Sequence, residues 1–223
     1  MNKESFKIYC AGPLFNPGER LEMKAIADIL KTNGYRVFLP QEDGLEFAKL
    51  FPFFIERGAT QQQAQQLLNM AIFALDVFQI IDSDGLILNM NGRVPDEGAM
   101  VEAGIAWARN KPVVIFNSDE RSLIHGNCNP LVTGLSNFET VRCCEDIPSA
   151  FKRKFDEQVD RITGSIPLEF EQTTKEGQEI SKFLNSQNQY HKLADLLMEL
   201  FGGKVCQHTK QKTERDIQAH TQQ

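Results

Sequence analysis

Four short apolar segments recur along the chain, and a helical pattern separates each from the next. The segments are residues 6–11, 35–39, 85–89 and 112–116. Apolar residues with helical spacing fill 19–32 and 61–81, and a further helix is expected just after Asp96. Strands that alternate with helices form a parallel sheet whose two faces are both covered by helices. The order therefore predicts an α/β fold of the flavodoxin-like, doubly wound type.

Composition divides the chain into three segments. Residues 1–146 contain every strand-like run, including a short one expected at 138–141, and form the predicted α/β domain. Residues 147–203 show helical periodicity alone, and we expect a C-terminal helical extension there. Its helices are expected at about 148–163, 167–184 and 188–201. Residues 204–223 are rich in Gln, Lys, His and Thr, so we expect a disordered tail.

A long connection follows the second strand and runs from Gln41 to Gly58. It contains an aromatic patch made of Phe47, Phe51, Phe53 and Phe54. We expect an irregular loop here, because loops of this length inside a compact domain are usually functional or act as lids. Thr60 is expected to cap the helix that follows.

The charge and composition argue against several classes of partner. The net charge is −6 and no basic stripe is present, which is unsuited to binding a phosphate backbone. No secretory signal precedes the first strand, and no run approaches the ~20 apolar residues of a membrane span. Five cysteines and four histidines lack the spacing of disulfide frameworks or metal ligands. We therefore expect a cytoplasmic protein without a metal site or cofactor, and without nucleic-acid or membrane partners.

The most informative motif is Asp96-x-Gly98-x-x-x-Glu102-x-Gly104, which lies between the third and fourth apolar runs. It predicts a loop that leaves a buried strand, turns at Gly98 and enters a helix carrying Glu102 between small apolar residues. Open α/β sheets bind ligands at this point, outside the carboxyl ends of their strands. A carboxylate there can serve as a nucleophile or a general base. The alternative is that Glu102 faces solvent on an amphipathic helix.

Together with this motif, several other segments resemble one enzyme family. They are Lys7–Phe15, Phe38–Gly44, Asp76 and Asn129–Leu131. In this order they are similar to the nucleoside 2-deoxyribosyltransferases, and the resemblance covers about residues 5–145. The C-terminal helices have no counterpart in the short members of that family.

The resemblance implies that the chain transfers a 2-deoxyribosyl group from one nucleobase to another through a covalent sugar–enzyme ester. Glu102 would then be the nucleophile that attacks C1′ of the sugar. Tyr9 would hydrogen-bond to Glu102 and orient it. Asp76 would be the acid–base group that protonates the departing base, since burial in an apolar stretch favours a neutral carboxyl.

Two further implied residues concern the 5′ end of the sugar. Asp96 would hold the 5′-hydroxyl, and its negative charge would repel a 5′-phosphate, which favours nucleosides over nucleotides. Asn129 resembles a residue that an adjacent subunit contributes to the same part of the site. The resemblance therefore implies a homo-oligomer with shared active sites.

The remaining implied contacts involve the base and the walls of the site. Phe15 would stack on the base, and Asp43, with Gln41 less clearly placed, would lie near the base edge. Gly12 and Gly98 belong to the motifs of the family and would line the substrate site. The implied partners are small-molecule nucleosides and nucleobases.

Most of these residues also have a purely structural alternative. Tyr9 could be an ordinary strand aromatic, and Asp76 could lie at the rim of a helix. Asp96 could act as a helix N-cap, which is compatible with the substrate role. Phe15 could belong to the core, and Asn129 could simply begin a turn before Pro130.

Two other functions remain open at this stage. An N-glycosidase that hydrolyses nucleosides, deoxynucleosides or deoxynucleoside 5′-monophosphates would use the same ester and pass the sugar to water. A non-catalytic nucleotide-sensing module could share the architecture, because fold alone does not fix function. A sensor, however, has no need of a nucleophile with a separate acid.

Overall fold

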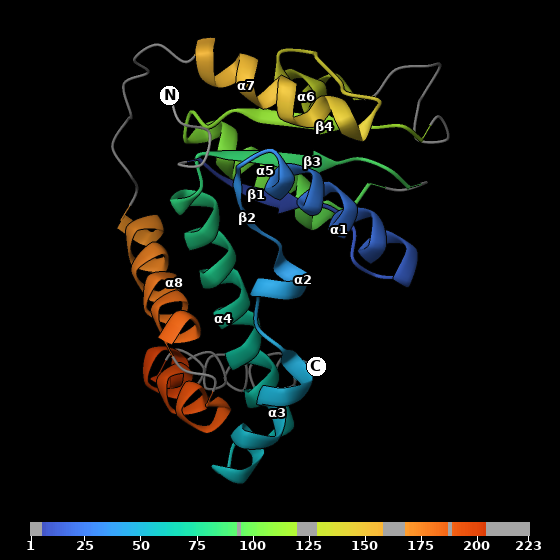
Figure 1. Cartoon of the computed structure of the whole chain (residues 1–223). Helices are drawn as coiled ribbons and strands as arrows, with labels where there is room; N and C mark the ends of the chain where they lie inside the picture. The colour runs from blue at the N-terminus through green and yellow to red at the C-terminus, as the bar shows by residue number, and fades with distance from the viewer. Residues whose placement is uncertain (1–5, 93–94, 120–128, 158–167, 187–188, 204–223) are drawn as a thin grey trace, which may run out of the picture. The chain divides into compact units, whose positions relative to one another are not determined.

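The computed structural model describes residues 6–92, 95–119, 129–157, 168–186 and 189–203 (Figure 1). Contacts group the chain into two compact units. The first unit combines residues 1–44 with 76–170, and the second combines 45–75 with 171–223. Each unit is described separately below.

The first unit is built on a four-stranded parallel sheet. Its strands are β1 (Lys7–Ala11), β2 (Arg36–Phe38), β3 (Gly85–Asn89) and β4 (Val113–Phe116). The strand order is β2-β1-β3-β4 and all pairs are parallel, so the predicted doubly wound α/β fold is confirmed. The order reverses between β1 and β3, and this topological switch point is where open α/β sheets form a crevice for ligands.

One face of the sheet packs against two helices, α1 (Pro17–Thr32) and α7 (Ile147–Glu157). Asn16 begins α1 through a capping box with Glu19, which satisfies backbone groups at the helix start. The opposite face contacts α5 (Glu97–Ala108). Small residues on α5 allow this close approach, and three of them, Ala99, Ala103 and Ala106, are buried.

Aromatic side chains join α7 to the first unit. Phe151 and Phe155 belong to the same buried cluster as the side chains of β1 and β3. The rings of Phe6 and Phe155 stack 4.1 Å apart, and the Tyr35 hydroxyl donates a hydrogen bond to the Pro148 carbonyl. Composition placed a boundary at 146/147, whereas these contacts group α7 with the sheet.

The predicted irregular connection over 41–58 is wrong, because two helices occupy it. They are α2 (Pro40–Asp43) and α3 (Phe47–Glu56). Proline suits the first turn of a helix, so Pro40 can begin α2 instead of only ending β2. In α3 the apolar side chains recur at helical spacing, and Leu50 and Phe54 are fully buried.

The short strand expected at 138–141 is reduced to a single parallel bridge between Phe116 and Val141. It follows α6 (Pro130–Thr133) and the 3₁₀ turn η3 (Gly134–Ser136). Asn137 and Phe138 both have positive φ, which is incompatible with an extended strand. A second 3₁₀ turn, η4 (Cys144–Asp146), leads into α7.

The second unit is helical. It contains α3, the first two thirds of α4 (Gln61–Asp82), α8 (Leu168–Ser186) and a final helix over 190–203. Arg57, which ends α3, forms an ion pair with Asp195 at 2.5 Å and donates to the His191 carbonyl. The Tyr190 hydroxyl donates to Glu46 at 2.6 Å. These contacts explain why residues 45–75 group with the C-terminal helices.

Among the described residues, α4 is the one helix with the length and apolar composition of a membrane span, although we expected no such segment. Half of its apolar window is buried, as in the core helix of a soluble protein. The helix is therefore only weak evidence for a membrane. The predicted disordered tail at 204–223 lies outside the described residues.

Substitution of two glycines by alanine should change the stability in opposite directions. A Cβ on Gly12 would lie 2.5 Å from the Met23 sulfur and 2.8 Å from the Asn89 Cβ, whereas a Cβ on Gly104 in α5 would meet nothing within 4 Å. We expect Gly12→Ala to lower the free energy of unfolding by about 1–3 kcal/mol through overpacking. Gly104→Ala should raise it by about 0.5–1 kcal/mol, because alanine favours a helix. Urea unfolding measures both, and equal stabilities would contradict the packing described here.

Candidate active site

A hydrogen bond between β1 and α5 lies at the centre of the candidate site. The Tyr9 hydroxyl donates to Glu102 Oε1 at 2.7 Å, across 93 residues of sequence. Tyr9 is fully buried and its ring stacks with Phe38 on the neighbouring strand. Because alternate side chains of a strand face opposite sides of the sheet, Tyr9 faces α5 while Ile8 and Cys10 join the cluster with α1. The expected hydrogen bond is therefore present.

A second carboxyl group lies next to the same hydroxyl. Asp76, on the part of α4 that belongs to the first unit, lies close enough to Tyr9 for the two side chains to shift each other's pKa. Burial raises the pKa of Asp76 to about 7, and the contact with Tyr9 opposes that shift. The structure therefore brings together all three residues that the sequence predicted as catalytic.

The environment of Glu102 favours its neutral form. Burial is the main cause that raises the pKa of this carboxyl to about 8. The hydrogen bond from Tyr9 lowers the pKa, whereas the charges of Asp76 and Asp96 raise it. Burial, followed by the neighbouring carboxylates, also raises the pKa of Tyr9 well above its ordinary value, so its hydroxyl stays protonated at neutral pH.

This geometry has a direct chemical consequence. A tyrosine hydroxyl has one hydrogen to donate, and here it faces two carboxyl groups. Both carboxyl groups are poised to change protonation near neutral pH, and they titrate as a coupled pair. A pair with one ionised and one protonated member contains both a nucleophile and an acid.

Asp96 lies at the N-cap of α5 and accepts a hydrogen bond from the Gly98 backbone at 3.1 Å. The expected N-cap role is therefore confirmed. Its effect on the pKa of Glu102 shows that the two carboxylates are close enough to interact. A Cβ on Gly98 would make only ordinary contacts with the Asp96 carboxylate, so space alone does not require glycine there.

Phe15 and Gly12 belong to the segment between β1 and α1. Phe15 is 79% exposed, so the alternative that it belongs to the core is wrong. Gly12 is buried against Met23 and Asn89, which explains why that position has no side chain. Neither observation tests the predicted contacts of these residues with a substrate.

The residues predicted near the base edge form local contacts around α2. Asp43 is exposed, and its carboxylate accepts a hydrogen bond from the Leu39 backbone at 2.7 Å. The Gln41 amide nitrogen donates to the Arg20 carbonyl at 2.9 Å, while its Oε1 is buried without a partner among the described residues. Their contact with a base stays a prediction.

Asn129 is exposed and caps α6 by accepting a hydrogen bond from the Leu131 backbone at 2.9 Å. The alternative that it begins a turn before Pro130 is therefore confirmed, and this role leaves its amide nitrogen available for other contacts. Whether it also serves a neighbouring subunit stays a prediction.

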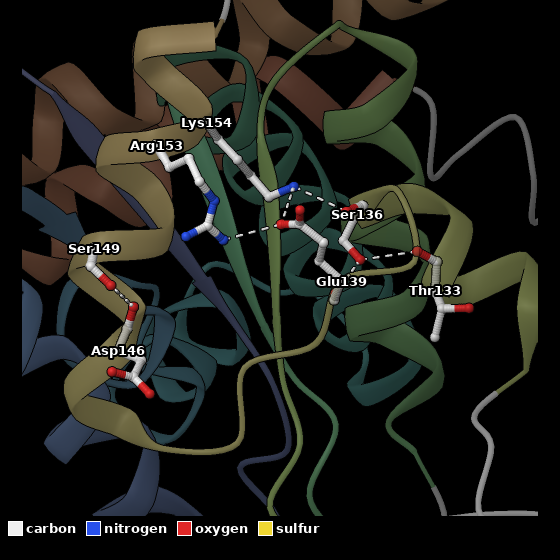
Figure 2. Close-up of polar contacts among 7 residues, drawn as sticks. All are labelled: Thr133, Ser136, Glu139, Asp146, Ser149, Arg153 and Lys154. Atoms are coloured by element: carbon white, nitrogen blue, oxygen red, sulfur yellow. Dashed lines mark hydrogen bonds and ion pairs between the residues drawn. The ribbon is translucent and has the colours of Figure 1, made fainter.

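Polar contacts between the segment after α6 and α7 fix this part of the chain (Figure 2). Glu139 forms ion pairs with Arg153 at 3.2 Å and with Lys154 at 3.6 Å. Lys154 also donates to the Ser136 carbonyl at 3.0 Å, and the Ser136 hydroxyl bonds to the carbonyls of Thr133 and Glu139. The short helix that Asn129 caps is thus held on the first unit by α7.

A polar network at the same edge of the sheet was missed by the sequence analysis. It joins Glu22 of α1 to Asn89 and Asn91, which end β3 and begin the loop after it. The signal in the sequence was two asparagines directly after an apolar strand, where buried amides need partners. Among the described residues, no group of three or more His, Cys, Asp and Glu side chains could hold a metal ion.

Comparisons with known proteins agree with this architecture. A family profile described as nucleoside 2-deoxyribosyltransferase matches residues 8–189. A solved structure, the crystal structure of a conserved protein from Enterococcus faecalis V583, aligns with a TM-score of 0.51 and 23% sequence identity. The alignment covers 67% of this chain and 98% of that one, and at this identity it supports the fold alone. Among curated proteins, no sequence matches this chain significantly.

The raised pKa of Glu102 predicts how stability depends on pH. Its folded pKa of about 8 exceeds the ordinary value of 4.5, so the native state binds the proton more tightly than the unfolded state. The stabilisation that comes from this tighter proton binding is therefore complete below about pH 4.5. It is lost as the pH rises towards 8, because the buried carboxyl group then has to ionise. We expect Glu102→Gln, which cannot ionise, to gain stability over the wild type by at most about 1.4 kcal/mol per pH unit in this window.

Thermal unfolding at several pH values measures this difference. Asp76→Asn is the matched comparison, and its advantage should level off nearer pH 7. A constant difference between Glu102→Gln and wild type from pH 5 to 8 would contradict a buried, ionisable Glu102.

Proposed function

Because the chain belongs to the nucleoside 2-deoxyribosyltransferase family, we propose that it transfers a 2-deoxyribosyl group between nucleobases through a covalent ester on Glu102. The observation that carries this proposal is the hydrogen bond from buried Tyr9 to Glu102, beside the second carboxyl group of Asp76. This constellation supplies a nucleophile, an acid and a group that orients the nucleophile.

In the first step, the Glu102 carboxylate attacks C1′ of a 2′-deoxynucleoside on the face opposite the base. The bond between C1′ and the base nitrogen breaks as the bond between C1′ and the carboxylate oxygen forms. Asp76 gives its proton to the departing base, which leaves as a neutral nucleobase. Burial raises the pKa of Asp76 to about 7, so a part of the protein carries a proton there at neutral pH. The pKa of Glu102 is raised further, to about 8, so the scheme requires that the proton of the pair lies on Asp76 and not on Glu102 when the attack begins.

In the second step, a different nucleobase attacks C1′ of the ester. The Asp76 carboxylate takes the proton of the incoming base, and Glu102 leaves as a carboxylate. Two displacements restore the original configuration at C1′, as in retaining glycosidases. None of these proton or bond changes requires a metal ion or a cofactor.

Tyr9 serves both steps in this scheme. Before the attack its hydroxyl stabilises the ionised form of Glu102. Once the ester has formed, Glu102 is uncharged and Asp76 is a carboxylate. The Tyr9 hydroxyl then makes a stronger hydrogen bond to Asp76 than to the ester. That contact holds Asp76 ready to accept the next proton.

The substrate contacts follow the family pattern. Asp96 holds the 5′-hydroxyl from the start of α5, close enough to interact with Glu102. Phe15, which is exposed before α1, stacks on the base, and Asp43 lies near the base edge. Gly12 and Gly98 belong to the segments that line the sugar site in this proposal.

One experiment separates transfer from its two alternatives. The protein is incubated with 2′-deoxyinosine, with and without free adenine or cytosine, and the products are followed by chromatography. Transfer gives a new deoxynucleoside only when the acceptor base is present. Free sugar formed at the same rate with and without acceptor would identify an N-glycosidase. Binding without turnover would identify a sensor.

Glu102→Ala should abolish transfer while the fold survives. Removal of a covalent nucleophile costs several orders of magnitude in rate, and each tenfold loss is ~1.4 kcal/mol of activation free energy. Initial rates with 2′-deoxyinosine and adenine measure the loss, and circular dichroism checks the fold. Val101→Ala is a control on the same helix, since Val101 is 60% exposed. Activity of Glu102→Ala within tenfold of wild type would rule out the nucleophile.

Asp96 should make the protein prefer nucleosides to nucleotides. A carboxylate at the 5′ end repels a phosphate, so we expect a large excess of kcat/KM for deoxyadenosine over its 5′-monophosphate. Asp96→Ser should weaken nucleoside use and narrow this gap, while its hydroxyl can still cap α5. If the wild type prefers the monophosphate, the nucleotide hydrolase becomes the better hypothesis.

The shared-site hypothesis predicts complementation between inactive variants. If a neighbouring subunit supplies Asn129 to each site, mixing Glu102→Ala with Asn129→Ala should restore part of the activity. Some sites of the mixed oligomer then receive both intact residues. Activity of the wild type should also fall on dilution below the dissociation constant of the oligomer. A monomer with full specific activity, or mixtures that stay inactive, would show that Asn129 serves only α6.

A further inference from the structure

The carboxylate of Glu22 on α1 binds two asparagine side chains from the end of β3. Asn89 Nδ2 donates to Glu22 Oε2 at 2.8 Å, and Asn91 Nδ2 donates to Glu22 Oε1 at 2.6 Å. Each carboxylate oxygen therefore has its own amide donor. Asn89 is fully buried and Asn91 is 9% exposed, so both amides depend on these partners.

Asn91 also connects to the segment after β4. Its Oδ1 accepts hydrogen bonds from the backbones of Ser118 at 2.8 Å and Asp119 at 3.0 Å. Its Nδ2 lies 3.0 Å from the Ser118 hydroxyl, and Gly92 donates its backbone N–H to the Asp119 carboxylate at 3.2 Å. The first residues of the loop after β3 are thus fixed from two sides.

This network lies at the switch point of the sheet, which connects it to the proposed function. The order of the sheet reverses between β1 and β3, so the crevice for ligands lies between the segments that follow these two strands. The segment after β1 contains Phe15 and continues into α1. The segment after β3 continues towards Asp96 and α5. The hydrogen bond from Asn91 to Glu22 joins α1 to the start of the segment after β3.

A carboxylate is the side chain best suited to this position. Both facing groups are amide N–H donors, and a carboxylate offers an acceptor oxygen to each. A glutamine would keep one acceptor and present an N–H to the other amide. The Glu22→Gln change therefore breaks one bond and leaves a buried donor facing a donor, although the shape hardly changes.

On the basis of the function proposed above, we propose that Glu22 is a positioning residue that fixes the start of the loop after β3 and thereby the place of Asp96 against the sugar 5′-hydroxyl. Glu22 acts through Asn91, and its role is separate from the bond changes at Glu102. Loss of the hydrogen bond between Glu22 and Asn91 should therefore weaken binding of the 5′-hydroxyl by Asp96 without changing the chemistry at C1′.

The test compares two substrates that differ only at the 5′ position, 2′-deoxyadenosine and 2′,5′-dideoxyadenosine. For Glu22→Gln we expect kcat/KM to fall about tenfold or more with the first substrate, because a misplaced charged partner loses most of its hydrogen-bond contribution. With the second substrate, which cannot bind Asp96 through a 5′-hydroxyl, the fall should stay within about threefold. Asp28→Asn is the matched control, since Asp28 is an exposed carboxylate on the same helix and should leave both substrates unaffected.

A reciprocal pair of substitutions tests whether Glu22 acts through Asn91. Asn91→Asp keeps the acceptor oxygen for Ser118 and Asp119 but sets a carboxylate against Glu22, so it should show the same selective loss. In the double variant E22Q/N91D, the glutamine N–H can donate to the new carboxylate while its oxygen accepts from Asn89. The double variant should therefore recover most of the activity with 2′-deoxyadenosine, even if either single variant folds poorly.

Each result decides the matter. The positioning role is supported if kcat/KM falls selectively with 2′-deoxyadenosine in the single variants and recovers in the double variant. Equal losses with both substrates, no loss in Glu22→Gln, or a selective loss that the double variant does not rescue would each overturn it. A wild-type protein inactive on both substrates would instead show that the proposed function itself has failed.

Discussion

The hydrogen bond between Tyr9 and Glu102 depends on burial, and the rest of the candidate site depends on that bond. Withdrawal from water raises the pKa of both Glu102 and Asp76, which would leave two neutral acids if nothing opposed it. The Tyr9 hydroxyl lowers the pKa of both carboxyl groups again. Because Tyr9 is fully buried on β1, its position is fixed. One donor shared between two carboxyl groups allows one of them to ionise while the other keeps its proton.

The parallel sheet is what brings these groups together. Tyr9 lies on β1, Asp76 on α4 and Glu102 on α5, yet their side chains are close enough to interact with one another. The Glu22 network lies at the end of β3, on the side of the sheet covered by α1, whereas Tyr9 meets Glu102 on the side covered by α5. The carboxyl groups proposed as catalytic and the proposed positioning group thus lie on opposite sides of the sheet, and either can be changed without direct contact with the other.

Different contacts hold the helices of the two units. In the first unit, α7 packs its aromatic side chains on the sheet and holds the segment that follows α6 (Figure 2). In the second unit, Arg57 and Tyr190 join α3 to the C-terminal helix. The stretch that suggested a lid over 41–58 instead forms α3, whose buried side chains are Leu50 and Phe54.

The sequence by itself determined the alternation of strands and helices and the helix that carries Glu102, because strand and helix periods and the Asp-x-Gly-x-x-x-Glu-x-Gly motif are local signals. It pointed to Tyr9 and Asp76 through the family resemblance. It did not reveal α3 or the loss of the 138–141 strand, since a Phe-rich stretch fits several structures and the positive φ of Asn137 and Phe138 has no sequence signature. The grouping of α7 with the sheet and the hydrogen bonds of Glu22 were decided only by tertiary structure. Both depend on contacts between residues far apart in the chain, such as Glu22 with Asn91, and a local pattern cannot encode which distant partner a buried polar or aromatic side chain will find.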